Sequence, residues 1–279
     1  MRLGGAIEKP YGNPEEWVAL VKRLGYSAVL APVSCEADSA VRQAYLAAAR
    51  ENDLVIGEVG VWKNCLSKDE GERKAAMDYA KAQLELAEEL GANCCVNIMG
   101  SRSEIWDGFA VENYDEDVYA MGVESIREII DAVKPKHTSY SIESMPWITP
   151  DSPEQYLKLL KDVDRGEAFG VHLDFVNMIN CPERYVRSTE FIRHCFSLLG
   201  PYIKSIHGKD VLMERAYTTL IHETMPGRGT LDYTKILPMV ENLGPDTTFF
   251  IEHLPDFDAY QQAAAYIRNQ AALAGVEVK

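Results

Sequence analysis

The chain has 279 residues, of which 47% are hydrophobic, and it carries a formal net charge of −15. This size suffices for one large core, since α/β barrels of this length fold as a single domain. The acidic charge argues against a nucleic-acid partner or an anionic membrane surface, because phosphate binding requires a basic surface. No apolar run approaches the length of a membrane span, and no basic segment followed by a long apolar stretch opens the sequence, so we expect no membrane partner and no signal peptide.

The six cysteines are scattered along the chain, and none forms a CxxC pair. The adjacent Cys94 and Cys95 cannot both face one metal from a strand, because successive side chains of a strand point to opposite sides. We interpret the cysteines as reduced thiols of the core. This usage is typical of a cytoplasmic protein.

Strand and helix patterns alternate along the whole chain. The first helix, for example, opens at Asn13-Pro14, where Asn caps and Pro takes the first helical position, and it ends at Gly25. In chain order, the predicted strands cover residues 2–7, 27–31, 54–59, 93–98, 138–143, 168–174, 202–207 and 247–252. The predicted helices cover residues 14–24, 39–52, 70–90, 115–133, a stretch opening at 152–153, and then 182–198, 231–243 and 256–274. A long loop is predicted over 208–230.

Eight strand–helix alternations without a linker predict a parallel sheet closed into a (β/α)8 TIM barrel. We expect residues 1–279 to form this single α/β domain. A doubly wound open sheet is the alternative. It is disfavoured because no GxGxxG motif follows the first strand.

Four predicted strands end on a residue that can ligate a metal: Glu143, Asp174, His207 and Glu252. The intervals of 31 and 33 residues between the first three are about one strand–helix unit each, and the last interval of 45 residues adds an insert. Side chains at the carboxyl ends of neighbouring barrel strands converge. The four residues are therefore predicted to surround one divalent cation, and three carboxylates with one imidazole suit Mn²⁺, Mg²⁺ or Co²⁺ better than structural zinc.

Two carboxylates beside a metal-bound hydroxy-ketone suit proton transfer. One takes the proton alpha to the carbonyl, and the other returns a proton on another face or carbon. We assign these roles to Glu143 and Glu252, while Asp174 and His207 chiefly hold the metal. Which Glu is the base stays open.

Two further histidines lie near these four residues in the sequence. His172 lies two residues before Asp174, on the same face and one layer deeper, and is expected to be a packed core histidine. His253 follows Glu252, so strand alternation predicts that it faces away from the barrel interior.

Several residues near the strand ends are candidates for substrate binding. Lys209 points the same way as His207 and could reach a substrate oxygen, with a salt bridge at the rim as the alternative. Arg228, flanked by glycines, could bind a hydroxyl or phosphate or simply form a turn. Trp62 and Trp147 follow strands and could provide a wall for a sugar ring or pack the loops. Glu58, near the end of the third strand, could hydrogen-bond substrate.

At these residues the chain resembles the xylose isomerase-like TIM-barrel superfamily, the sugar phosphate isomerase/epimerase group, over essentially its whole length. The matching pieces are Ile142-Glu143, His172-Leu-Asp174 with Asn177, His207-Gly-Lys-Asp210, Pro226-Gly-Arg-Gly229 with Leu231-Asp-Tyr233, and Ile251-Glu252. In ketose 3-epimerases of this group, the Glu, Asp, His and Glu at these positions bind Mn²⁺ or Co²⁺, and the two Glu are the acid/base pair. The resemblance thus implies one metal ion, Mn²⁺ first, with Co²⁺, Mg²⁺ or Zn²⁺ as alternatives.

The chain departs from those epimerases at Asn177. They tend to carry there, three residues after the Asp, a histidine that contacts substrate, and we expect Asn177 to contact substrate in its place. Endonuclease IV, of the same superfamily, holds three metals with several additional histidines. This chain has Asn97 on the fourth strand and no histidine near the end of the second. Together with the acidic charge, this argues against DNA repair.

The resemblance therefore implies a metal-dependent isomerase or epimerase of a keto-sugar or related polyol, in cytoplasmic carbohydrate metabolism. The superfamily also contains lyases, namely inosose dehydratases and the large subunits of C-glycoside deglycosidases, in which the same proton abstraction ends in elimination. The sequence does not separate the two outcomes. A non-enzymatic sugar-binding module would require the set of four metal ligands to be incomplete. Whether the protein forms a homo-oligomer is left open.

Overall fold

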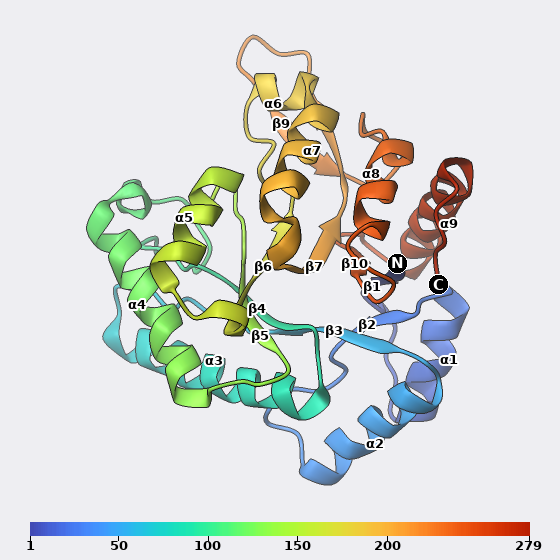
Figure 1. The fold of residues 1–279 in the computed structure, drawn as a ribbon, viewed down its shortest axis with the longest axis horizontal. Coiled ribbons are helices and arrows are strands. Elements are labelled where there is room, and N and C mark those ends of the chain that lie inside the picture. The colour runs from blue at the N-terminus through green and yellow to red at the C-terminus, as the bar shows by residue number, and fades with distance from the viewer.

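Eight parallel strands form a barrel in the computed structural model, which describes residues 1–279 (Figure 1). Their order around the barrel is β1, β10, β7, β6, β5, β4, β3, β2. This arrangement confirms the predicted (β/α)8 barrel. The strands are β1 (Arg2–Gly5), β2 (Ala28–Leu30), β3 (Val55–Gly60), β4 (Cys94–Ile98), β5 (Ser139–Glu143), β6 (Phe169–Asp174), β7 (Ile203–Gly208) and β10 (Thr248–Ile251).

Helices follow the strands and cover the outside of the barrel. They are α1 (Pro14–Leu24), α2 (Ser39–Glu51), α3 (Glu70–Leu90), α4 (Glu116–Val133), α5 (Pro153–Val163), α6 (Pro182–Val186), α7 (Ser188–Leu199), α8 (Tyr233–Glu241) and α9 (Phe257–Ala274). The cap expected for α1 is present: Asn13 Oδ1 accepts the Glu16 N–H at 2.9 Å, and Gly25 ends the helix at φ 71°. None of the helices combines the length and apolar character that a bilayer crossing demands.

The barrel is open only between β1 and β2, where the hydrogen-bonded ladder is interrupted. Even there, the Ser27 N–H donates to the Leu3 carbonyl at 3.0 Å. A Cβ at Gly4 would lie 2.5 Å from the Phe250 ring and 2.6 Å from the Ala28 carbonyl oxygen. The glycine therefore lets β1 approach β2 and Phe250 closely, and the barrel is nearly closed.

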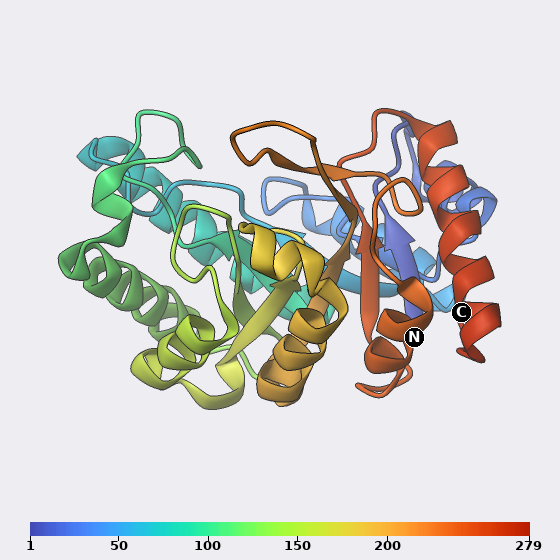
Figure 2. The same ribbon diagram turned by 90° about the horizontal axis from the view of Figure 1, so that it is seen from above.

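The structure corrects the sequence-based elements in two places. The helix predicted over 182–198 is two helices, α6 and α7, which meet at Arg187. The loop predicted over 208–230 contains an antiparallel hairpin of β8 (Asp210–Met213) and β9 (Ile221–Thr224). The carboxylate of Asp210 accepts the N–H groups of Val211, Gly227 and Leu231 and so fastens both ends of this insert. The hairpin lies over the carboxyl ends of the barrel strands (Figure 2).

The interior of the barrel is also polar below those carboxyl ends. Glu58, His172, Ser205 and Thr248 come from four different strands and are each at most 2% exposed. Such groups are stable in a core only when they pair with one another. Their pairing places a layer of charged and polar side chains directly beneath the predicted metal ligands.

Candidate active site

The four predicted metal ligands come together at the carboxyl end of the barrel. Glu143 ends β5, Asp174 ends β6, His207 lies in β7, and Glu252 directly follows β10. One ligand atom from each lies within 4.8 Å of the others. His207 Nδ1 is 3.0 Å from Glu143 Oε1 and 2.8 Å from Glu252 Oε2. The barrel thus brings together all four members of the group, which we call the quartet.

Burial and like charge make the quartet electrostatically strained without a cation. Burial raises the pKa of Asp174 well above its ordinary value, and the neighbouring Glu252 and Glu143 add to the rise while Lys209 opposes it. Burial would lower the pKa of His207, but Glu252, Glu58 and Glu143 raise it well above the usual range. Positive charge is therefore strongly favoured at this point.

The donor set fits a divalent cation. Asp174 Oδ2 is buried and accepts no hydrogen bond. Lys209 Nζ lies 2.8 Å from this oxygen, which makes an ion pair without hydrogen-bond geometry. An oxygen with a free lone pair, two further carboxylates and an imidazole nitrogen form a ligand set typical of Mn²⁺ or similar ions.

Lys209 lies beside the quartet and is 1% exposed. Its ammonium group contacts Asp174 and Glu252 of the quartet, and it lies 3.1 Å from Glu223 Oε2. Burial lowers the pKa of Lys209, but these carboxylates raise it well above its ordinary value. Lys209 therefore remains charged and offsets part of the negative charge. Its side chain does not line the pocket described below.

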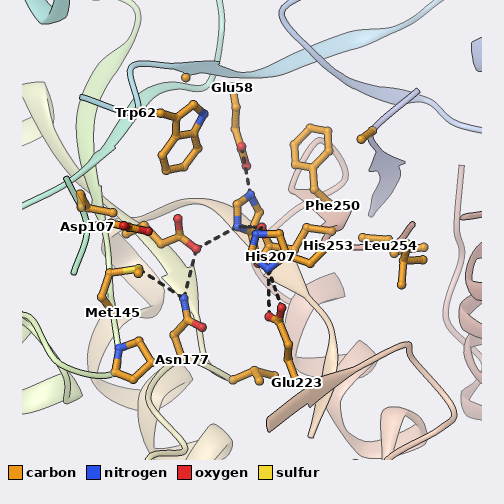
Figure 3. A pocket seen from close by; sticks show the side chains of 18 of the residues that line it. Glu58, Trp62, Asp107, Met145, Asn177, His207, Glu223, Phe250, His253 and Leu254 are labelled. Carbon is orange, nitrogen blue, oxygen red and sulfur yellow. Dashed lines mark hydrogen bonds and ion pairs between the residues drawn. The ribbon is translucent and has the colours of Figure 1, made fainter. Parts of the chain in front are cut away.

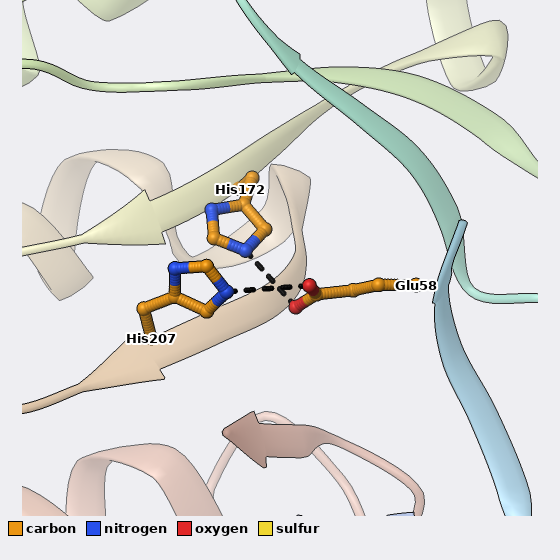
Figure 4. Close-up of side chains that lie close together, drawn as sticks. All are labelled: Glu58, His172 and His207. Atoms are coloured by element: carbon orange, nitrogen blue, oxygen red, sulfur yellow. Dashed lines mark hydrogen bonds and ion pairs between the residues drawn. The ribbon is translucent and has the colours of Figure 1, made fainter. Parts of the chain in front are cut away.

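Glu58 points toward the rings of His172 and His207 (Figure 4). Its two carboxylate oxygens lie 3.0 Å from His172 Nε2 and 3.2 Å from His207 Nε2, and Ser205 Oγ also donates to Glu58. The rings of His172 and His207 meet edge to face at 4.1 Å. Because His207 Nε2 pairs with Glu58, the other nitrogen, Nδ1, is turned toward Glu143 and Glu252.

Asn177 braces two members of the quartet. Its backbone N–H donates to Asp174 Oδ1 at 2.9 Å. Its side-chain amide donates to the Ser144 carbonyl at 3.0 Å and to Glu143 Oε1 at 3.4 Å. The same side chain also borders the pocket (Figure 3).

A pocket of about 1430 Å³ opens above the quartet. Among the residues predicted to bind substrate, it is lined by Trp62, Trp147, Asn177 and Glu58, the last of them 2% exposed. Arg228 does not line the pocket; it is exposed in the turn that follows β9. The structure therefore gathers the predicted residues on one cavity with the exception of Arg228 and Lys209.

Two residues at the pocket were not anticipated as functional. Glu223, in β9, lies 2.9 Å from His253 Nδ1 and also pairs with Lys209. His253 was expected to face away from the interior, but its backbone adopts the left-handed region at φ 55°, which breaks the strand alternation, and the side chain lines the pocket. The only sequence signal for Glu223 was the long insert that carries it.

The family model for the xylose isomerase-like TIM barrel matches residues 18–270. The chain belongs to this family. A solved D-tagatose 3-epimerase-like protein is 17% identical, covers 99% of this chain and 98% of its own, and superposes with a TM-score of 0.73. A D-psicose 3-epimerase crystallised in the presence of D-fructose is also 17% identical, covers 99% and 100%, and has a TM-score of 0.70.

A third similar structure is a xylose isomerase-like TIM barrel protein from Mycobacterium smegmatis in complex with magnesium. It is 16% identical, covers 97% of this chain and 92% of its own, and has a TM-score of 0.68. At these identities the structural likeness establishes the fold alone. No curated protein matches the chain.

Proposed function

We propose that the protein is a divalent-metal-dependent isomerase or epimerase of a keto-sugar or related polyol. The observation that carries this proposal is the placement of Glu143 and Glu252 at 3.0 and 2.8 Å from the same nitrogen of His207. Their strands, β5 and β10, flank the pair β6 and β7 in the barrel order. The two carboxylates therefore approach His207 from opposite sides of the site, as proton transfer on two faces of one substrate requires. Similar structures named as sugar 3-epimerases support the reaction class.

The quartet would hold one divalent cation, for which we propose Mn²⁺, with Co²⁺, Mg²⁺ and Zn²⁺ as alternatives. When bound, such a cation polarises a carbonyl and stabilises negative charge that develops beside it. Asp174 and His207 serve chiefly to hold it. Glu58, through His207 Nε2, and Asn177, through Asp174 Oδ1, keep these two ligands in place.

Glu143 and Glu252 would carry the proton. Burial raises the pKa of both carboxyls, but His207 outweighs it, so that the pKa of Glu143 lies below its ordinary value and that of Glu252 well below. Both side chains are therefore ionised before substrate binds, which a base requires. One removes the proton alpha to the substrate carbonyl and later releases it to water, and the other takes a proton from water and delivers it to the opposite face or the neighbouring carbon.

Proton NMR in D₂O tests the proposal. The Mn²⁺-loaded protein is incubated with free ketohexoses and ketopentoses, and the expected result is an epimer or isomer that carries one solvent-derived deuterium. Loss of a substituent with a new double bond would instead establish the lyase alternative. That activity would resemble inosose dehydratases or C-glycoside deglycosidase large subunits. If no keto-sugar exchanges a proton while metal is bound, both the isomerase or epimerase proposal and the lyase alternative are contradicted. A sugar-binding module would then be favoured.

A further inference from the structure

The pocket above the quartet offers no free cationic side chain to a phosphate, because its three histidines each pair with a carboxylate. None of its 36 lining residues is Lys or Arg. Six are acidic: Glu8, Glu58, Asp107, Glu143, Glu223 and Glu252. The ammonium group of Lys209, beside the quartet, is already paired with three carboxylates. A doubly negative phosphate would meet repulsion here without a compensating ion pair, so the pocket suits an uncharged ligand.

Three of the four tryptophans line this one pocket. Trp62 follows β3, Trp106 lies in the loop after β4, and Trp147 lies in the loop after β5. Their exposed fractions are 37, 40 and 38%, whereas Trp17, in the core, is 1% exposed. Indole surface left open inside a cavity is a typical feature of a site for an apolar group.

The backbone holds these indoles in place. Trp62 adopts a left-handed φ of 49°, which is uncommon for a bulky residue. Its ring lies over Gly60, where a Cβ would come within 2.1 Å of Trp62 Nε1. Trp147 Nε1 donates to the Asp107 carbonyl at 2.8 Å and ties the loops after β4 and β5 together. Such strain and cross-linking are more typical of a ligand clamp than of ordinary loop packing.

The indole of Trp62 lies across the pocket from part of the polar lining. Figure 3 shows Trp62 and Met145 on one side, with His207, Glu223 and His253 across from them. The volume of about 1430 Å³ exceeds the range of roughly 300–1,000 Å³ that encloses a drug-sized ligand. A single sugar seated on the quartet would therefore leave the indole side unfilled.

We infer that the substrate is an uncharged sugar or polyol joined to an apolar ring. The polyol end lies on the quartet, and the apolar ring lies against Trp62, Trp106 and Trp147. The position inferred for the polyol end depends on the proposed function. The position inferred for the apolar ring depends only on the three indoles.

Calorimetric titration of the Mn²⁺-loaded protein tests this inference with three probes: methyl β-D-glucopyranoside, phenyl β-D-glucopyranoside and glucose 6-phosphate. We expect the phenyl glycoside to bind at least about tenfold more tightly than the methyl glycoside, because the added ring is buried on aromatic side chains. Glucose 6-phosphate should bind no more tightly than the methyl glycoside.

Variants locate the effect. Trp62→Ala and, independently, Trp147→Ala should remove the advantage of the phenyl glycoside while the affinity for the methyl glycoside stays within about twofold, since the ring contributes only to the first. Tyr202→Ala is the matched control, because Tyr202 is a 43% exposed aromatic residue just before β7, at the opposite end of the barrel. It should keep the full advantage.

Equal affinity for the two glycosides, tighter binding of the phosphate, or no binding of any probe would overturn the inference. The titration requires no turnover, and it is repeated on metal-free protein. A phenyl advantage that persists there would show that the apolar ring binds independently of the metal. If the Mn²⁺-loaded protein also exchanges no keto-sugar proton, the proposed function is refuted and the apolar site still stands.

Discussion

The two ends of the barrel differ in how their charged side chains are arranged. At the amino ends of the strands, Arg2 is 5% exposed and pairs with Asp53 at 2.9 Å and with Asp246 at 2.8 Å. The chain termini also meet there, where the Met1 ammonium donates to the Glu277 carbonyl at 3.1 Å. At the carboxyl ends, by contrast, three carboxylates of the quartet lie within 4.8 Å of one another.

This difference separates stability from chemistry. The charges at the amino ends are matched and lie beside solvent, so they can stabilise the fold. At the carboxyl ends, burial and the neighbouring Glu252 and Glu143 raise the pKa of Asp174, so its burial as a carboxylate costs folding free energy, and such an arrangement is typical of a site that binds a ligand. In barrels of this type the carboxyl end carries the active site. Changes at one end should therefore leave the property of the other end intact.

The largest effect is expected from Glu143→Gln and Glu252→Gln. Each change removes a proposed proton carrier but preserves the size of the side chain, so kcat should fall by about 10²–10⁴-fold or to the detection limit. The urea midpoint of the metal-free protein should fall, because each carboxylate is the buried partner of His207 and its lowered pKa means that the fold stabilises the ionised group. Initial rates and urea unfolding measure the two quantities. Full activity in either variant would refute the acid/base assignment.

Loss of metal is the next effect. Asp174→Ala and His207→Ala each remove a ligand, so purified protein should fall from about one bound ion per chain to near none. Mass spectrometric metal analysis, before and after dialysis against Mn²⁺, gives the count. Wild-type and Asp174→Ala proteins with the same metal content would show that the quartet is not the metal site.

Glu58→Gln should have a smaller effect on the same property. A Gln amide oxygen cannot replace both carboxylate oxygens that pair with His172 Nε2 and His207 Nε2. His207 is then less firmly oriented, and the affinity for Mn²⁺ should fall by about 10–100-fold. Competition with a metal-binding dye measures this without turnover. Glu8→Gln, an exposed pocket residue with no contact to His207, is the control, and equal losses in both variants would contradict the positioning role of Glu58.

The sequence predicted those parts of the fold that depend on local signals. Asn13 caps and Gly25 ends α1 through contacts within a few residues, and the strand-end ligands Glu143 and His207 follow from where apolar runs stop. Convergence of the quartet required only the general geometry of parallel barrels. These features are therefore readable from one chain.

The remaining features depend on contacts between distant segments. Glu58 meets His172 across 114 positions of sequence, inside the barrel, and no local pattern reports that distance. The turn around Arg228 is fastened by Asp210, which accepts the Gly227 N–H and carries the arginine away from the pocket. His253 faces the pocket because of one left-handed backbone angle, which alternation cannot predict.

The smallest predicted effect, on stability alone, concerns the amino end. Arg2→Met keeps an apolar stem but removes the hydrogen bonds to Asp53 and Asp246, whose side chains are 80 and 63% exposed and can turn to water. The free energy of unfolding should therefore fall by about 2 kcal/mol. This is the loss expected when hydrogen bonds to charged groups are removed and the remaining partners can bind water instead. Urea unfolding measures the loss, and Mn²⁺ affinity should be unchanged, because no contact connects Arg2 to the quartet. A parallel loss of metal affinity would mean that the two ends of the barrel are coupled, and the division between a stabilising and a reactive end would be wrong.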